Sequence, residues 1–252
     1  MIESNKVKEK LKAGENTAGA IMGIYSPAIV EMLGHAGYDF IIIDDEHGAY
    51  SWSELEDMIR TARLVDLIPI VRTDYNPSSI QKVLDRGAYG IQIPMVNTKE
   101  DAELVVQRAK YPPAGRRGTA FSMRAAGYGY DSGKSFMDKS DDNILISVHI
   151  ETPEAVKNFE EIVSVPGIDI AFIGPTDLSV NMGYKDGAGH PEVQEVINSL
   201  YTKSKKSGIH MGTIATSKED LASAFEKGAS FVSVVTTAML KKNFDEVLRG
   251  AE

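Results

Sequence analysis

The chain has 252 residues, 42% of them hydrophobic and 25% charged, which suits one large or two small globular domains. Its 27 lysines and arginines against 36 aspartates and glutamates give a net charge of −9. This balance argues against nucleic-acid binding, which depends on clustered basic side chains. The absence of cysteine excludes a disulfide scaffold, thiolate zinc and a cysteine nucleophile.

The sequence carries no recognisable targeting or membrane segment. Residues 1–16 are rich in charge and lack the apolar core of a signal peptide. No apolar run approaches the roughly 18 residues that a transmembrane helix needs. We therefore expect a cytoplasmic protein without a membrane or nucleic-acid partner.

Apolar runs of strand length recur along the chain, with segments of helical spacing between them. We predict strands at 19–23, 40–43, 68–71, 90–93, 144–150, 170–173, 209–213 and 231–235. We predict helices at 52–64, 78–84, 99–109, 154–163, 192–205, 218–225 and 238–248. Ser51 or Ser53 is suited to cap the first of these helices. Four glycines stand where helices should end, at positions 37, 87, 208 and 228.

The alternation of eight strands with helices predicts a single (β/α)₈ TIM barrel over residues 1–252. A doubly wound open sheet is the alternative. The segment 111–143 is expected to be irregular, as a lid, a binding loop or a disordered stretch. Part of it could cross the mouth of the barrel or pack on a neighbouring subunit. Arg116, Arg117 and Arg124 in this segment could meet an acidic substrate or could be solvated surface charges.

Chemically capable residues directly follow the predicted strands, where a barrel carries its catalytic groups. Glu151 and Asp177 end neighbouring strands, and adjacent strands lie only about 4.8 Å apart. The two carboxylates could therefore share one divalent cation, with open positions for substrate or water. His149 projects from the same side of its strand as Glu151, and it could bind the metal, contact the substrate or fill the barrel.

Two further residues near strand ends suit acid–base and charge chemistry. His47 follows the second strand, and a histidine with its ordinary pKa near ~6.5 can carry a proton. Arg72 ends the third strand and offers a planar fork for a carboxylate or an enolate. The stretch from Gly174 to Thr176 could offer backbone N–H groups to a substrate carboxylate at the start of a helix.

Residues and motifs that the sequence lacks exclude other kinds of catalysis. No lysine stands at a strand end, so a Schiff base with a carbonyl substrate is not expected. Neither a Gly-x-Gly-x-x-Gly after the first strand nor a Walker loop is present, so nucleotide binding has no support. Metal assistance remains as the way to stabilise a carbanion beside a carbonyl.

Six stretches together resemble the HpcH/HpaI aldolase family, the metal-dependent class II 2-keto-3-deoxy acid aldolases. They are DFIIIDDEH at 39–47, PIVR at 69–72, IPMV at 93–96, YPPAG at 111–115, IET at 150–152 and IGPTDLS at 173–179. The resemblance extends from about residue 17 to residue 245. Members include 4-hydroxy-2-oxoheptanedioate and 2-dehydro-3-deoxyglucarate aldolases.

The resemblance implies a role for each matched site residue. Glu151 and Asp177 would bind Mg²⁺, or Mn²⁺ or Co²⁺, and His47 would be the general base, acting through a metal-bound water. Arg72 would stabilise the enolate. Asp85 matches an aspartate that raises the basicity of the histidine; because Asp85 ends a predicted helix, the contact would have to cross a subunit interface or follow a bent path.

Substrate contacts are implied for His149, Gly174, Thr176 and Asp177. His149 stands where the family has glutamine, and Thr176 stands where alanine is common. The implied reaction is cleavage of a 4-hydroxy-2-oxo acid to pyruvate and an aldehyde through a metal-bound pyruvate enolate. The alternatives are an oxaloacetate decarboxylase like macrophomate synthase, and a non-catalytic 2-oxo acid binding protein. The resemblance also implies a homo-oligomer, a trimer or a hexamer.

Overall fold

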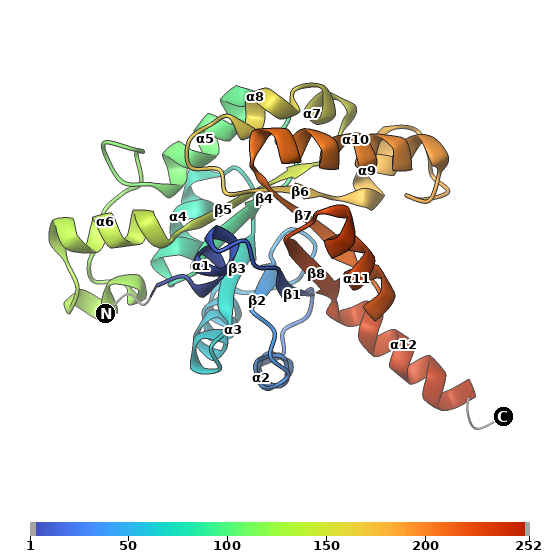
Figure 1. The fold of residues 1–252 in the computed structure, drawn as a ribbon. Helices are drawn as coiled ribbons and strands as arrows, with labels where there is room; N and C mark the ends of the chain where they lie inside the picture. Colours follow the sequence, from blue (N-terminus) through green and yellow to red (C-terminus); the bar gives the residue numbers. More distant parts are fainter. Residues whose placement is uncertain (1–3, 250–252) are drawn as a thin grey trace.

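The computed structural model describes residues 4–249, and its centre is a closed parallel barrel in which β1 to β8 pair in sequence order (Figure 1). The strands are β1 (Thr17–Met22), β2 (Phe40–Asp44), β3 (Ile68–Arg72), β4 (Gly90–Ile93), β5 (Leu145–Ile150), β6 (Ile170–Ile173), β7 (His210–Ala215) and β8 (Phe231–Val235). The predicted TIM barrel is confirmed. Residues 1–3 and 250–252 of the expected domain lie outside the described residues, and the single-domain boundary stays a prediction.

Helices surround the barrel. They are α1 (Lys6–Lys12), α2 (Pro27–His35), α3 (Trp52–Leu64), α4 (Pro77–Asp85), α5 (Lys99–Ala109), η1 (Arg124–Gly129), α6 (Gly133–Asn143), α7 (Pro153–Lys157), α8 (Phe159–Val163), α9 (Pro175–Asn181), α10 (Pro191–Ser207), α11 (Lys218–Lys227) and α12 (Thr236–Arg249). Every predicted helix is present, and the one expected at 154–163 is divided at Asn158.

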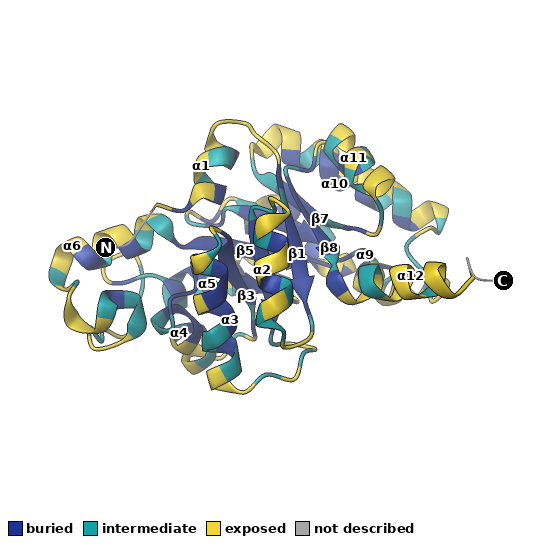
Figure 2. Ribbon diagram, turned by 90° about the horizontal axis from the view of Figure 1, so that it is seen from below, coloured by how far each residue is buried: buried dark blue, intermediate teal, exposed yellow. Residues whose placement is uncertain are grey.

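One prediction about the segment 111–143 was wrong. The segment is not irregular throughout, because it contains η1 and α6. Phe136 of α6 is buried against Tyr111 and Ala126, and these three side chains form a small apolar cluster of their own. The segment is therefore a packed appendage on the outside of the barrel, on the side away from α12 (Figures 1 and 2).

Helix boundaries follow from capping. Ser51 begins α3 with a capping box, in which its side chain accepts from the backbone of Glu54 and the Glu54 side chain accepts in return. At the other end of helices, Gly208 and Gly228 have φ of +75° and +109°, a left-handed backbone that glycine adopts freely.

Two apolar cores result from the alternation of side chains along the strands. Phe40 and Ile42 of β2 point into the barrel, while Ile41 and Ile43 face the helices. The strands are buried while the outer faces of the helices are exposed (Figure 2). No helix in the described part of the chain is long and apolar enough to cross a membrane. Because the alternation continues to the strand ends, inward positions at the carboxyl end open onto the mouth of the barrel.

Candidate active site

An ion pair joins the carboxyl ends of β2 and β3. Asp44 and Arg72 are in register as the last residues of the two strands. Arg72 donates from Nε to Asp44 Oδ1 at 2.8 Å and from Nη2 to Oδ2 at 2.6 Å. Burial by itself would raise the pKa of Asp44, but the hydrogen bonds and charge of Arg72 outweigh it and lower that pKa. The guanidinium is therefore held in one orientation at the mouth.

His47 lies in the loop that follows β2. Its backbone N–H donates to Asp44 Oδ1 at 3.2 Å, and its Nε2 is 3.8 Å from Glu46 Oε2. The same Glu46 oxygen is 3.3 Å from Arg72 Nη1. The side chain of His47 remains 67% exposed. The imidazole is thus linked through Glu46 to Arg72, and it is accessible to a molecule that enters the mouth.

Glu151 follows β5 and is almost fully buried, with both carboxylate oxygens occupied. Its Oε1 accepts from the backbone N–H of Met95 at 2.7 Å, and its Oε2 is 2.7 Å from Nδ1 of His149. Burial alone would raise the pKa of Glu151, yet these contacts and the charge of Arg72 lower it. Glu151 is therefore an anion at neutral pH, and its electrostatic interaction with Arg72 indicates that the two clusters share one mouth.

The tautomer of His149 follows from this contact. The ionised Glu151 carboxylate can only accept hydrogen bonds, so Nδ1 of His149 must donate. In a neutral ring Nε2 is then an acceptor, and this atom is buried without a partner among the described residues. The ring stacks on Phe172 with the centroids 4.9 Å apart. His149 is therefore held by both the ring of Phe172 and the carboxylate of Glu151.

Glu151 and Asp177 meet at Gly174, which joins β6 to α9. A Cβ on Gly174 would lie 2.5 Å from Glu151 Oε2 and 3.7 Å from Asp177 Oδ2. The lack of a side chain at Gly174 therefore allows the Glu151 carboxylate to lie against the backbone at this point, with the Asp177 carboxylate close by. Within residues 4–249, no three His, Cys, Asp or Glu side chains gather closely enough to hold a metal ion by themselves. Two carboxylates that lie beside the same glycine fit a hard cation such as Mg²⁺, which takes its other positions from water or substrate.

Asp85 is not brought to His47 within the described chain. Asp85 ends α4, and its Oδ1 accepts from Nη2 of Arg117 at 2.8 Å. No hydrogen bond or ion pair links it to His47 in residues 4–249.

Arg117 and Arg124, considered as substrate contacts, line a cavity at the other end of β4 and β5. Thr176 is exposed at the start of α9.

Three residues support the site in ways that were not predicted from the sequence. They are Asp44, which orients Arg72; Met95, whose backbone N–H holds Glu151; and Asn181, whose amide donates to the Glu151 carbonyl at 2.9 Å. A signal existed for Asp44, because opposite charges that end neighbouring strands in register should pair. Met95 acts through its backbone, and Asn181 lies within a helix, so neither left a pattern in the sequence.

A closed barrel with carboxylates, a guanidinium and a histidine at one mouth is the arrangement of a barrel enzyme. A profile of the HpcH/HpaI aldolase/citrate lyase family matches residues 22–243. A 2-keto-3-deoxy-L-rhamnonate aldolase of Escherichia coli O9:H4 (strain HS) is 36% identical over 239 residues, which cover 94% of this chain and 89% of that protein.

Solved structures of the same family have the same fold as this chain. A protein of the HpcH/HpaI aldolase/citrate lyase family from Burkholderia cenocepacia J2315 superposes with a TM-score of 0.93 at 26% identity, covering 98% of this chain and 99% of the other. An HpcH/HpaI aldolase from Desulfitobacterium hafniense DCB-2 gives 0.90 at 29%, covering 97% and 95%. The chain belongs to the HpcH/HpaI aldolase/citrate lyase family. The expected resemblance is confirmed, and with it the expectation of an enzyme, a carbon–carbon lyase of the aldolase class.

Proposed function

We propose that this enzyme cleaves a 4-hydroxy-2-oxo acid to pyruvate and an aldehyde with the help of a divalent cation. The observation that carries the proposal is the pair of carboxylates, Glu151 and Asp177, which both lie beside Gly174 at the mouth of the barrel. The preferred substrate class is a 2-keto-3-deoxy sugar acid, because a relative with 36% identity is named for such a substrate. A 4-hydroxy-2-oxo dicarboxylate is the second substrate to test.

Glu151 and Asp177 would hold the cation, and Mg²⁺, Mn²⁺ or Co²⁺ suits two carboxylate oxygens. When bound, the cation would supply Lewis-acid polarisation of the substrate's 2-oxo group. Because Met95 and His149 fix both oxygens of Glu151, that carboxylate is already oriented before the cation arrives. This preorganisation lowers the free-energy cost of assembling the site.

The protein groups account for the proton and charge movements. His47 would take the proton from the 4-hydroxyl, directly or through a water molecule, as the C3–C4 bond breaks and the aldehyde carbonyl forms. The electron pair of that bond passes to C3, giving the enolate of pyruvate, and Arg72 would offset its negative charge. Return of a proton to C3 completes pyruvate. The start of α9 at Gly174 and Thr176, together with His149, would contact the substrate carboxylate and 2-oxo group.

The proposal is tested by incubating the metal-stripped enzyme with a 2-keto-3-deoxy sugar acid or with 4-hydroxy-2-oxoheptanedioate. Each cation is added in turn, and the release of pyruvate is measured. We expect activity to return with a divalent cation and to be absent in Glu151→Gln, which should also lose cation binding in calorimetry. His47→Ala should keep cation binding but lose aldol cleavage by a factor of about 100 or more. Full metal-dependent turnover by Glu151→Gln would exclude the ligand assignment.

The rival reactions separate in the same assay. Decarboxylation of oxaloacetate needs no base for a hydroxyl group, so it should survive in His47→Ala if the decarboxylase alternative is correct. Cation binding without turnover of any of these acids would favour the binding-protein alternative. We also propose a homo-oligomer, because α12 carries exposed Phe244, Val247 and Leu248; its size, a trimer or a hexamer, is what the family resemblance implies.

A further inference from the structure

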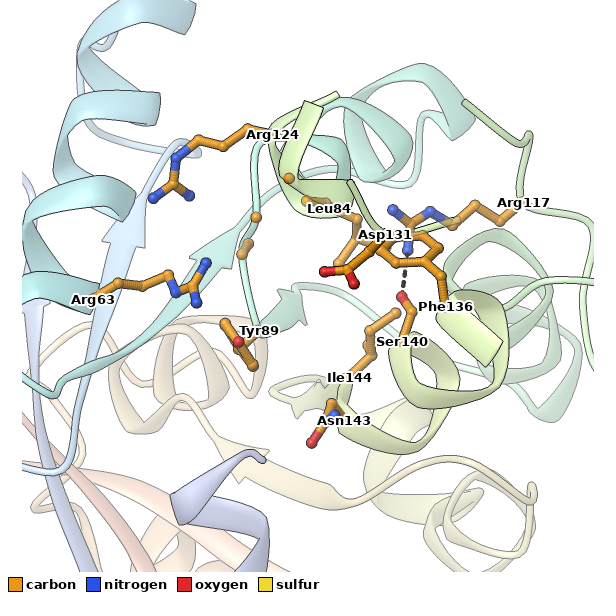
Figure 3. A pocket seen from close by; sticks show the side chains of 14 residues that line it. Arg63, Leu84, Tyr89, Arg117, Arg124, Asp131, Phe136, Ser140, Asn143 and Ile144 are labelled. Atoms are coloured by element: carbon orange, nitrogen blue, oxygen red, sulfur yellow. Dashed lines mark hydrogen bonds between the residues drawn. The ribbon is translucent and has the colours of Figure 1, made fainter. Parts of the chain in front are cut away.

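A cavity of about 180 Å³ lies at the end of β4 and β5 opposite to the candidate active site. Figure 3 shows the side chains that line it. Its walls include Tyr89, directly before β4, and Ile144, directly before β5, with α6 and η1 closing the outer side. The candidate catalytic residues follow the carboxyl ends of the strands, so the cavity is a separate place on the molecule.

Arginines from three different elements line this cavity. They are Arg63 of α3, Arg117 of the segment that follows α5, and Arg124 of η1. In Figure 3 the side chains of Arg63 and Arg124 extend toward one another, and a dashed line joins Arg117 to Ser140. Asp131 is the one acidic side chain among the described lining residues. Three arginines thus gather around one cavity on a chain whose net charge is −9.

The guanidinium of Arg124 has no carboxylate as an ion-pair partner in the described part of the chain. Its Nη1 donates to the backbone carbonyl of Arg86 at 3.0 Å, and no acidic side chain in residues 4–249 forms an ion pair with it. Burial, and then the positive charges of Arg63 and Arg60, lower the pKa of the guanidinium. The charges of Tyr128 and Glu56 act in the opposite direction but are weaker. A half-buried charge with like charges nearby and no ion-pair partner in residues 4–249 is unfavourable, and an anion in the cavity would relieve it.

Arg117 adds an anchored guanidinium with a spare donor. Only 4% of the residue is exposed. Its Nη2 donates to Asp85 Oδ1 at 2.8 Å, and its Nη1 donates to Ser140 Oγ at 3.3 Å. The Cζ atom lies 4.7 Å from the ring centroid of Tyr111. Its Nε–H is buried with no partner among the described residues. Buried donors are rarely left unpaired, so this atom is a second indication of a missing acceptor.

We propose that this cavity binds a small, multiply charged oxyanion, the phosphate or the carboxylates of a metabolite. Guanidinium groups present several N–H donors in a fixed plane, which matches the oxygens of carboxylate and phosphate. The hydroxyl of Ser140 and the amide of Asn143 line the same space and add neutral polar contacts. The proposal does not depend on the aldolase reaction, because none of these residues belongs to the mouth.

Calorimetry on the metal-free full chain tests the proposal, with inorganic phosphate and succinate titrated separately. We expect at least one probe to bind, and Arg124→Gln to weaken it about tenfold or more, since a hydrogen bond to a charged group is lost. Arg116→Gln is the matched control: it removes the same charge from an exposed position of the same segment. It should bind as the unaltered protein does, and so should Glu151→Gln, in which the mouth is altered.

The two probes identify the source of the oxyanion. Tighter binding of phosphate supports a phosphorylated metabolite, and tighter binding of succinate supports a di- or tricarboxylate. A crystal structure with selenate or tungstate provides a second readout, in which an anomalous peak should lie against Arg124. No binding of either probe, or equal binding by Arg124→Gln and the unaltered protein, would overturn the proposal.

Discussion

At the scale of single residues, the orientation of the Glu151 carboxylate is fixed by contacts to both of its oxygens. The backbone of Met95 and the ring of His149 occupy one oxygen each. Met95 adopts a left-handed φ of 56°, an unfavourable conformation for a residue with a side chain. The local cost of this backbone is offset by a hydrogen bond to a charged, buried acceptor, which is one of the stronger kinds in proteins.

His149 is expected to act on cation binding through Glu151. His149→Phe keeps an aromatic ring against Phe172 but removes the Nδ1–H donor, so Glu151 loses one of its two anchors. We expect the affinity of the metal-free protein for Mn²⁺ to fall by about 10–100-fold in calorimetry. His149→Gln retains an N–H donor and should restore part of the affinity. Equal affinity of His149→Phe and the unaltered protein would show that the hydrogen bond does not orient the carboxylate.

At the scale of elements, the junction between β6 and α9 positions the site. Gly174 ends the strand region and Pro175 begins the helix, so Asp177 emerges within the first helical turn. The φ of Gly174 is −90°, a value that any residue adopts. Glycine is therefore required at this position for space, because a Cβ would collide with Glu151 Oε2.

The change Gly174→Ala is expected to disable the enzyme without unfolding it. The added methyl group must displace the Glu151 carboxylate from its position beside Asp177. A displacement of about 1 Å can reduce the rate about 100-fold, and we expect a loss of this order in metal-dependent pyruvate release. Gly189→Ala is the matched control, since its Cβ would meet no atom within 4 Å. Unchanged turnover in Gly174→Ala would refute the steric argument.

At the scale of the whole molecule, α12 departs from the compact arrangement of the other helices. It follows β8 and extends away from the barrel (Figure 1). Only Thr236 at its start is buried, and Phe244, Val247 and Leu248 are exposed on it. Apolar side chains gathered on an exposed helix are typical of an interface with another chain.

Phe244→Asp is expected to shift the assembly toward smaller species in light scattering coupled to size exclusion. The charge would have to be buried without a partner if α12 packs on a second copy. Asn243→Asp adds the same charge beside the apolar stripe and should leave the mass unchanged. A monomer in the unaltered protein at micromolar concentration would contradict the proposed oligomer directly.

Most of the barrel could be predicted because its signals are local. The strands Phe40–Asp44 and Phe231–Val235 consist mainly of apolar residues, a composition that is typical of buried parallel strands. Helix α6 was missed because its sequence, GKSFMDKSDDN, is largely polar and buries only Phe136 and Ser140. Its position is decided by contact with Tyr111 and Ala126, and such contacts leave no periodic pattern in the sequence.

The sequence by itself determined the strands, the order of the barrel and the identity of the polar groups that end the strands. Only the tertiary structure decided their partners: Arg72 with Asp44, Glu151 with Met95, and Asp85 with Arg117. These partners are 28, 56 and 32 positions apart along the chain. Periodicity and capping act over a few residues, whereas these pairs depend on strand register and on how the segment 111–143 folds back, and both are set by packing of the whole chain.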